Sequence, residues 1–167
     1  MRLQTKESRG KTMSAITLKD ITSENFFQCI FLKSENSTQY TLFEENVASN
    51  AFSLAQTKVE PEWVTKAIYN EEDKMVGFTM YGRSPVLNVY FITRLMIDHR
   101  YQGKGYGRLA MLEIIEQMKQ FPCDEIYTSF VPTNDRAKKL YTSLGFEDTG
   151  RSVEFGNESE PLFCLKL

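Results

Sequence analysis

The sequence has no apolar run of the roughly 18 residues needed to cross a bilayer, and its N-terminus lacks the apolar segment of a secretory signal. We therefore expect a cytoplasmic protein that does not bind membranes. Histidine occurs once, and the three cysteines share none of the short spacings found in zinc sites. Neither a disulfide framework nor a metal site is expected.

The charge balance disfavours another class of partner. With 20 basic and 22 acidic residues the net charge is −2, and several of the basic residues fall in the first twelve positions. The rest of the chain is mildly acidic, which disfavours nucleic acid as a partner and is compatible with a cationic substrate. Residues 1–12 are polar and lack periodicity, so we expect them to be a disordered leader or tag, followed by a single domain at 13–167.

The N-terminal third predicts one strand and two short helices. Residues 15–21 have a strand pattern, and Ser23 can cap the helix that follows. The apolar face expected for this helix consists of Phe26, Phe27, Ile30 and Phe31. The second helical pattern, which ends before Pro61, is built on Val47, Ala51, Leu54 and Ala55.

Three strands are predicted next, at residues 63–69, 74–81 and 87–97, the first two joined by a hairpin turn. The third is almost continuously apolar, as is typical of a central strand covered on both faces. Further strands are expected at 125–130 and in a closing hairpin formed by residues 153–155 and 162–167. Two amphipathic helices are also expected. The first follows residues 103–107 and has a buried stripe of Met111, Ile114, Ile115 and Met118, and the second is capped by Asn134. This order of elements predicts one α/β (α+β) domain.

The most informative segment is Gln-Gly-Lys-Gly-Tyr-Gly at residues 102–107, between the apolar third strand and an amphipathic helix. Alternate glycines remove side chains where the backbone must come close to something, and amides at a helix N-terminus attract an anion. The spacing excludes both the G-x-G-x-x-G dinucleotide fingerprint and the P-loop. A phosphate or pyrophosphate site is predicted, and a glycine-rich turn without a ligand is the alternative.

This segment resembles the Q/R-x-x-G-x-G motif of the GNAT acetyltransferases, which binds the pyrophosphate of acetyl-CoA. Residues 95–98 resemble the end of the family's central strand, and residues 131–146 resemble its following segment, with an asparagine at a helix start, a tyrosine within the helix and a Leu-Gly-Phe ending. The resemblance implies the GNAT fold, a mixed and mostly antiparallel sheet that splays at the cofactor and is flanked by helices. The acetyl-CoA contacts that it implies are Leu95, Met96, Ile97, Gln102, Gly103, Lys104, Gly105, Tyr106, Gly107, Arg108, Asn134 and Tyr141.

Acetyl transfer to an amine requires a neutral nucleophile, a donor for the oxyanion and a proton for the departing thiolate. A free amide of residues 95–97 can serve the oxyanion. By resemblance, Tyr141 is the proton donor, although its place on an apolar helix stripe also suits a core aromatic. Asn134 can cap its helix and contact the cofactor at once.

The sequence does not identify the base that deprotonates the amine. Some polyamine acetyltransferases carry acidic residues just before the position of Leu95, where this chain has Thr93 and Arg94. Glu44 and Glu45 are preferred as catalytic carboxylates, because they lie near where family members admit substrate. The alternatives, each of which can equally be a solvated surface residue, are Glu71, Glu72, Asp98 and His99.

These features predict an N-acetyltransferase that moves the acetyl group of acetyl-CoA to a primary amine by direct attack in a ternary complex. A small polyamine or diamine such as spermidine or spermine is ranked first, from the acidic body and a likeness of residues 46–55 and the tail to bacterial polyamine acetyltransferases. An aminoglycoside-like amine and a protein amino group are alternatives, and a non-catalytic acyl-CoA-binding sensor is the alternative of another class. GNAT proteins often pair, so a homodimer is left open.

Overall fold

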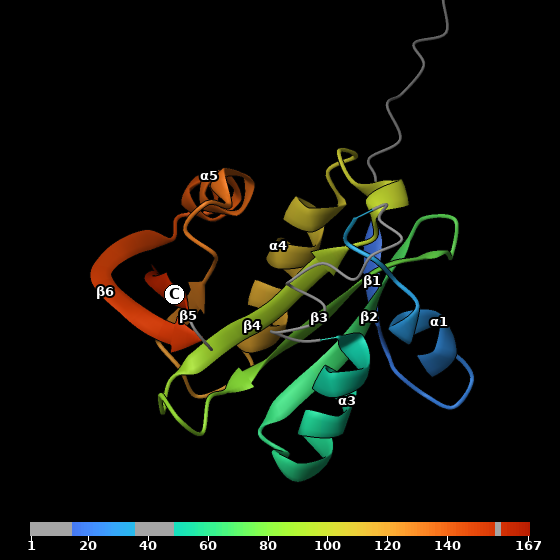
Figure 1. The fold of residues 1–167 in the computed structure, drawn as a ribbon, viewed down its shortest axis with the longest axis horizontal. Coiled ribbons are helices and arrows are strands. Elements are labelled where there is room, and N and C mark those ends of the chain that lie inside the picture. The colour runs from blue at the N-terminus through green and yellow to red at the C-terminus, as the bar shows by residue number, and fades with distance from the viewer. Residues whose placement is uncertain (1–14, 36–48, 156–157) are drawn as a thin grey trace, which may run out of the picture.

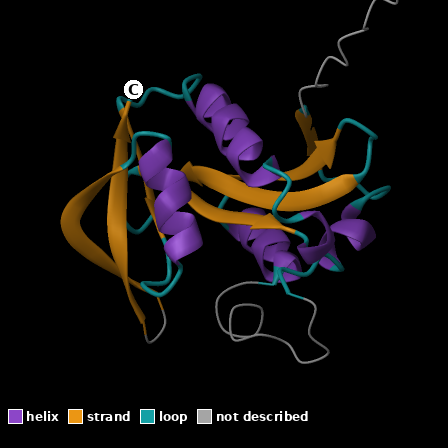
Figure 2. Cartoon of the chain, turned by 90° about the horizontal axis from the view of Figure 1, so that it is seen from above, coloured by secondary structure: helices purple, strands orange, loops and turns teal. Residues whose placement is uncertain are grey.

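The computed structural model describes residues 15–35, 49–155 and 158–167, which form a seven-stranded sheet with helices on both faces (Figures 1 and 2). No helix in these ranges is long and apolar enough to span a membrane. In chain order the elements are β1 (Ile16–Asp20), α1 (Phe26–Ile30), α3 (Asn50–Val59), β2 (Trp63–Asn70), β3 (Met75–Arg83), β4 (Tyr90–Ile97), the 3-10 turn η1 (His99–Tyr101), α4 (Tyr106–Met118), β5 (Glu125–Ser129), α5 (Asp135–Ser143), β6 (Glu147–Phe155) and β7 (Glu158–Lys166).

The sheet has the order β1-β2-β3-β4-β5-β7-β6, and every pair of neighbours is antiparallel except β4 and β5. The parallel pair is short, since only Phe91 with Tyr127 and Ile92 with Thr128 are in register. Beyond Ile92 the two strands separate, and β5, β7 and β6 turn away from the other four strands (Figure 2). The predicted mixed, mostly antiparallel sheet that splays at its centre is confirmed.

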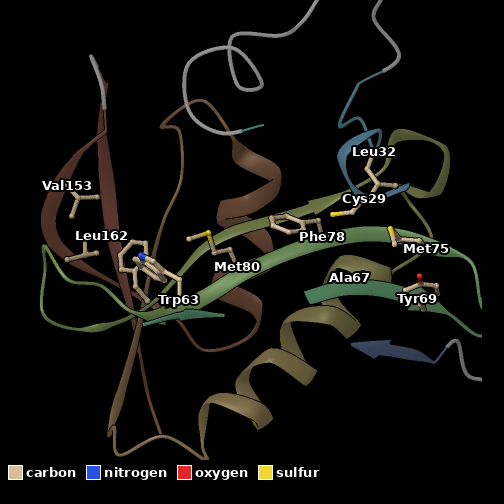
Figure 3. Close-up of a cluster of buried hydrophobic side chains, with 11 residues drawn as sticks. Cys29, Leu32, Trp63, Ala67, Tyr69, Met75, Phe78, Met80, Val153 and Leu162 are labelled. Atoms are coloured by element: carbon tan, nitrogen blue, oxygen red, sulfur yellow. The ribbon is translucent and has the colours of Figure 1, made fainter. Parts of the chain in front are cut away.

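Two hydrophobic layers cover the two faces of the sheet. One face packs under α1 and α3, in a cluster that runs from Cys29 and Leu32 to Val153 and Leu162 (Figure 3). The other face packs against α4 and α5, through Met111, Ile114, Tyr141 and other buried residues. Successive residues of a strand point to opposite faces, so each strand residue near the splay can be assigned to one layer.

The helices α4 and α5 follow the predictions closely. The predicted stripe of α4 is buried in full, with Met111 and Ile114 completely inaccessible. The Asn134 side chain caps α5 by accepting from the N–H of Ala137, at 3.0 Å. Gly145 lies just after this helix at φ 93°, where a side chain would be strained.

The predicted faces of the two N-terminal helices are wrong. In α1, which begins after Asn25 rather than Ser23, Phe27 and Phe31 are 61% and 70% exposed, while Cys29 is buried. Phe31 follows the last residue of this five-residue helix, and Phe27 lies about 100° around the helix from Phe26, so both side chains turn to solvent. In α3, Val47 lies outside the described residues, and the fully buried positions are polar, namely Asn50 and Ser53.

The buried polar residue Asn50 explains why α3 sits where it does. Its side-chain amide donates to the main-chain oxygen of Cys29, at 2.8 Å, which ties α3 to α1. The N-cap of α3 is Ser49, whose hydroxyl accepts from the N–H of Phe52 at 3.0 Å. A hydrophobic pattern cannot reveal an anchor made through a polar side chain.

Candidate active site

A bulge in β4 marks the start of the splay. Arg94 pairs with Met80, but the next pair joins Ile92 to Tyr81, so Thr93 is an extra residue in β4. Such a bulge bends its strand and increases the local twist. The rest of β4, from Leu95 to Ile97, therefore leaves β5 while staying paired with β3.

The hydrogen bonds of β3 show which groups of β4 face the opening. The N–H of Asp98 donates to the oxygen of Val76 at 2.9 Å. Alternate residues of a strand direct their N–H and C=O groups to the same neighbour, so Met96 and Arg94 also face β3. The amides of Leu95 and Ile97 consequently point the other way, toward the splay. Met96 bonds toward β3, and its side chain packs under α1 and α3. Two of the three predicted strand contacts thus present a main-chain amide to the opening.

The glycines of the turn adopt left-handed backbone conformations, with φ 77° at Gly103 and 87° at Gly105. A side chain is rarely tolerated there. A Cβ atom added to either residue would meet nothing within 4 Å, so the space in front of this turn is open. Within the protein itself, Gly103 and Gly105 are required because of their backbone angles. The glycine spacing predicts a different reason, namely that a close neighbour excludes a side chain at these positions.

Main-chain amides line this open space. The first amides to bond into α4 belong to Arg108 and Leu109, which both donate to the oxygen of Gly105, at 3.1 and 3.2 Å. Within the described residues, no acceptor is recorded for the N–H groups of residues 103–107. They stand at the positive end of the α4 dipole, where an anion is stabilised.

The side chains of Gln102 and Tyr106, two of the predicted contact residues, form hydrogen bonds within the protein. The Gln102 side-chain amide donates to the oxygens of Ser34 and Ile97, at 2.7 and 2.9 Å, and its oxygen accepts from Arg136. The Tyr106 side chain is buried between α4 and the sheet, in a cluster with Ile68 and Val76, and its hydroxyl donates to Glu71 at 3.2 Å. For both residues, only the main chain remains to meet a ligand.

The cations of the turn are placed differently. Lys104 is exposed, and its ammonium lies 5.3 Å from the ring centre of Tyr101. Arg108 donates to the Ser143 hydroxyl at 2.7 Å, which joins α4 to α5. Arg108 is therefore held at the edge of the open space, and Lys104 stands further out.

The splay and the turn enclose a cavity of about 760 Å³. Its walls are β4 from Ile92 to Ile97, the glycine turn, the end of β5 and one side of α5. It brings together all of the predicted cofactor contacts except Lys104, which is not among its lining residues. This volume lies within the range of about 300–1,000 Å³ that is typical of small-molecule and cofactor sites.

Tyr141 projects from α5 into the wall of this cavity and is 7% exposed. Its ring packs against Phe130 and Phe146, with centroid distances of 5.7 and 5.8 Å. Burial raises the pKa of Tyr141 to about 12, with a further rise from the charge of Glu160 and an opposing hydrogen bond with Thr128. The hydroxyl therefore keeps its proton at neutral pH and can donate it.

None of the alternative bases that the sequence suggested lines the cavity. Glu71 and Glu72 are exposed in the turn between β2 and β3. Asp98 is buried and caps η1; burial raises its pKa, but bonds from Arg100 and Lys33 outweigh this and lower it. His99 lies beside it and its N–H donates to the oxygen of Lys33.

Glu44 and Glu45, the preferred carboxylates, lie outside the described residues, so their roles stay predictions. Among the described residues, no group of three histidine, cysteine, aspartate or glutamate side chains is placed to hold a metal ion.

Several cavity residues were missed by the sequence reasoning, and Glu160 is the buried carboxylate among them. Glu160 on β7 is 7% exposed and accepts from the Ser129 hydroxyl at 2.5 Å. The closing hairpin was predicted to pair only from Leu162 onward, which placed Glu160 in a turn. The register of β6 with β7 pairs it with Val153 instead. The available signal was that Glu160 lies two residues before the buried Leu162, so both side chains point to the same face of a strand. This signal is weak.

Comparison with known proteins agrees with this arrangement. Residues 19–146 match the model of the acetyltransferase (GNAT) family. Over 152 residues the chain is 30% identical to the spermine/spermidine N(1)-acetyltransferase of Bacillus subtilis (strain 168), covering 86% of this chain and 95% of that protein. The N-alpha-acetyltransferase RimI of Mycobacterium tuberculosis is 31% identical over 74 residues, which cover 44% of each chain.

Among solved structures, the spermidine N-acetyltransferase from Vibrio cholerae in complex with CoA and spermine superposes with a TM-score of 0.70 at 16% identity, covering 90% of this chain and 95% of that one. The PaiA N-acetyltransferase from Thermoplasma acidophilum in complex with coenzyme A superposes with a TM-score of 0.66 at 17% identity, covering 92% and 99%. The fold, the family model and the identity to a curated relative agree: the chain belongs to the GNAT family of N-acetyltransferases.

Proposed function

We propose that this N-acetyltransferase transfers the acetyl group of acetyl-CoA to a primary amine of a small polyamine or diamine, such as spermidine or spermine. The amine attacks the thioester directly, in a complex that holds both substrates. One observation carries the proposal: a row of main-chain amides without acceptors in the described chain opens into the same cavity as the buried hydroxyl of Tyr141.

The glycine turn and the open edge of β4 would hold the donor. The amides of residues 103–107 bind the pyrophosphate, aided by the α4 dipole and the Arg108 guanidinium. The unpaired edge at Leu95 and Ile97 offers main-chain groups to the amide-bearing arm of coenzyme A. Asn134, at the start of α5, lines the same cavity. Bound acetyl-CoA supplies the activated acetyl group, and the chain supplies its orientation.

The chemistry requires three contributions from the chain. An alkylamine with a pKa of about 10.4 is almost wholly protonated at neutral pH, so its deprotonation costs about 4 kcal/mol and calls for a base. The Leu95 N–H, which faces the splay, stabilises the carbonyl oxygen as it gains negative charge. The Tyr141 hydroxyl, protonated because burial raises its pKa, protonates the departing sulfur.

Two lines of support favour a small polyamine acceptor. The Bacillus subtilis relative, which matches along most of both chains, is a spermine/spermidine N(1)-acetyltransferase. The Vibrio cholerae structure holds spermine. The shorter match to RimI, an N-alpha-acetyltransferase, makes a protein amino group the second candidate.

The test is a panel of acceptors assayed for thiol release from acetyl-CoA, with spermidine, spermine, putrescine, an aminoglycoside and a peptide with a free N-terminus. We expect the polyamines to give the largest kcat/KM. A larger value for the peptide would move the assignment to a protein amino group. Binding of acetyl-CoA without turnover of any amine would instead support a sensor module.

A further inference from the structure

Glu160 is a buried carboxylate in the cavity to which the proposed function assigns no part. Of the two described carboxylates that line the cavity, Glu35 is exposed and Glu160 is 7% exposed. One oxygen of Glu160, Oε2, accepts from the Ser129 hydroxyl at 2.5 Å. The other, Oε1, accepts no recorded hydrogen bond from the described residues. Burying a charge is costly, so a buried carboxylate with an oxygen to spare calls for an explanation.

Glu160 and Tyr141 approach the cavity from opposite faces of the sheet. Glu160 pairs with Val153, which belongs to the layer under α1 and α3, and it shares that face with Arg94 of β4. Tyr141 comes from α5, which packs on the other face. Both line the same cavity, so the splay between β4 and β5 connects the two faces at this point.

We propose that Glu160 is the acceptor-side carboxylate of this enzyme, which binds the ammonium group of the incoming amine and takes its proton. The inference rests on the proposed function and adds the base that it lacks. A thioester carbonyl held at the Leu95 amide has Glu160 toward one face and Tyr141 toward the other. The amine and the thiolate then lie on opposite sides of the reacting carbon.

The surroundings of Glu160 suit a base. Burial raises its pKa and the charge of Glu158 raises it further, whereas the Ser129 hydroxyl and the charge of Arg94 lower it, with a net rise. A carboxylate with a raised pKa holds a transferred proton more readily. Tyr141, whose pKa is raised mainly by burial and further by the charge of Glu160, is a further titratable group nearby.

The proposed step conserves protons and electron pairs. The ammonium gives one proton to Glu160, and the nitrogen lone pair then forms the bond to the carbonyl carbon. The carbon–sulfur bond breaks with its electron pair on sulfur, which takes the proton of the Tyr141 hydroxyl. The acetylated nitrogen gives up its excess proton to solvent, Tyr141 regains a proton from solvent, and Glu160 releases the proton that it took.

Glu160 also accounts for a difference between this sequence and those of some polyamine acetyltransferases. Where some polyamine acetyltransferases carry acids on the central strand, this chain has Thr93 and Arg94. The face of β4 toward the acceptor therefore offers no carboxylate at these positions. Glu160 supplies one from β7, across the splay, in the part that the sequence assigned to Glu44 and Glu45.

The decisive variant is Glu160→Gln, which keeps the size and hydrogen-bonding capacity of the side chain and removes its charge and basicity. We expect kcat/KM for spermidine to fall about 100-fold, while CoA affinity measured by calorimetry and the melting temperature stay near those of the parent. With an acceptor that is already neutral at pH 7, such as a hydrazide, the loss should shrink to a few-fold. The matched control is Glu154→Gln, an exposed glutamate on the neighbouring strand β6 that does not line the cavity, which should lose little with either acceptor.

Equal losses with both acceptors, an unchanged kcat/KM, or the same loss in the Glu154 control would overturn the assignment of Glu160. Should Glu160→Gln not fold, Ser129→Ala serves in its place. It removes the hydrogen bond that lowers the pKa of Glu160, so the acidic limb of the kcat/KM profile should move to higher pH; an unmoved limb also overturns the assignment. If the parent enzyme acetylates no amine, the proposed function fails as well, whereas parent activity with an unimpaired Glu160→Gln removes only the role of Glu160.

Discussion

The two ends of the cavity are built from different kinds of group. The end proposed for the donor consists mostly of main chain, namely the amides of residues 103–107 and the edge of β4 released by the bulge at Thr93. The end proposed for the acceptor consists of side chains from separate strands, with Arg94, Ser129 and Glu160 on β4, β5 and β7. Backbone geometry tolerates change in the surrounding side chains, whereas a side-chain site changes with each substitution. Donor recognition in this enzyme is therefore expected to be robust and acceptor choice easily altered.

The largest test of this contrast is Tyr141→Phe, which removes one hydroxyl between the two ends. We expect kcat to fall about 100-fold, because the leaving thiolate loses its proton donor, with CoA affinity nearly unchanged. Steady-state kinetics and calorimetry on the same preparation measure both. Tyr127→Phe is the matched control, since its hydroxyl bonds to Glu125 outside the cavity. An unaltered kcat in Tyr141→Phe would leave this residue as a core aromatic.

The next effect concerns the main-chain end. Gly105→Ala places a side chain at φ 87°, where the strain is about 1–2 kcal/mol. Relief of that strain turns the amides away from the pyrophosphate, so CoA affinity should fall about tenfold, while kcat at saturation is kept.

Gly150→Ala is the control for this variant, because Gly150 has φ 70° and equally open surroundings but lies in β6, away from the cavity. Both variants should lose similar stability on thermal unfolding. A comparable loss of CoA affinity in both would show that the strain, and not the amides, was being measured.

The smallest effect tests Asn134, a polar side chain that lines the cavity at the start of α5. Asn134→Ala removes a helix cap and should cost about 1 kcal/mol of unfolding free energy, together with a few-fold loss of CoA affinity if Asn134 also contacts the donor. Ser49→Ala removes the corresponding cap of α3, which lies away from the cavity. Denaturant titration should give similar stability losses for the two variants, and calorimetry should separate them. Equal CoA affinities would restrict Asn134 to capping.

The contrast between the two ends also explains what could be predicted from the sequence. The glycine turn, the α4 stripe and the Asn134 cap depend on neighbours within a few residues, and each was located correctly. The exposed Phe27 and Phe31 and the buried Asn50 depend on how α1 meets α3, which no local pattern encodes. Glu160 became visible only through its pairing with Val153 and the splay of two strands distant in sequence.

The central claim is that the main-chain amides of residues 103–107 bind the diphosphate of acetyl-CoA. Residue-resolved amide hydrogen exchange, measured with and without CoA, tests it most directly. The account predicts that these amides exchange fast in the free protein and become strongly protected with CoA, together with Leu95 and Ile97, while Gly150 is unaffected. Saturation with CoA that leaves the exchange of residues 103–107 unchanged would contradict it.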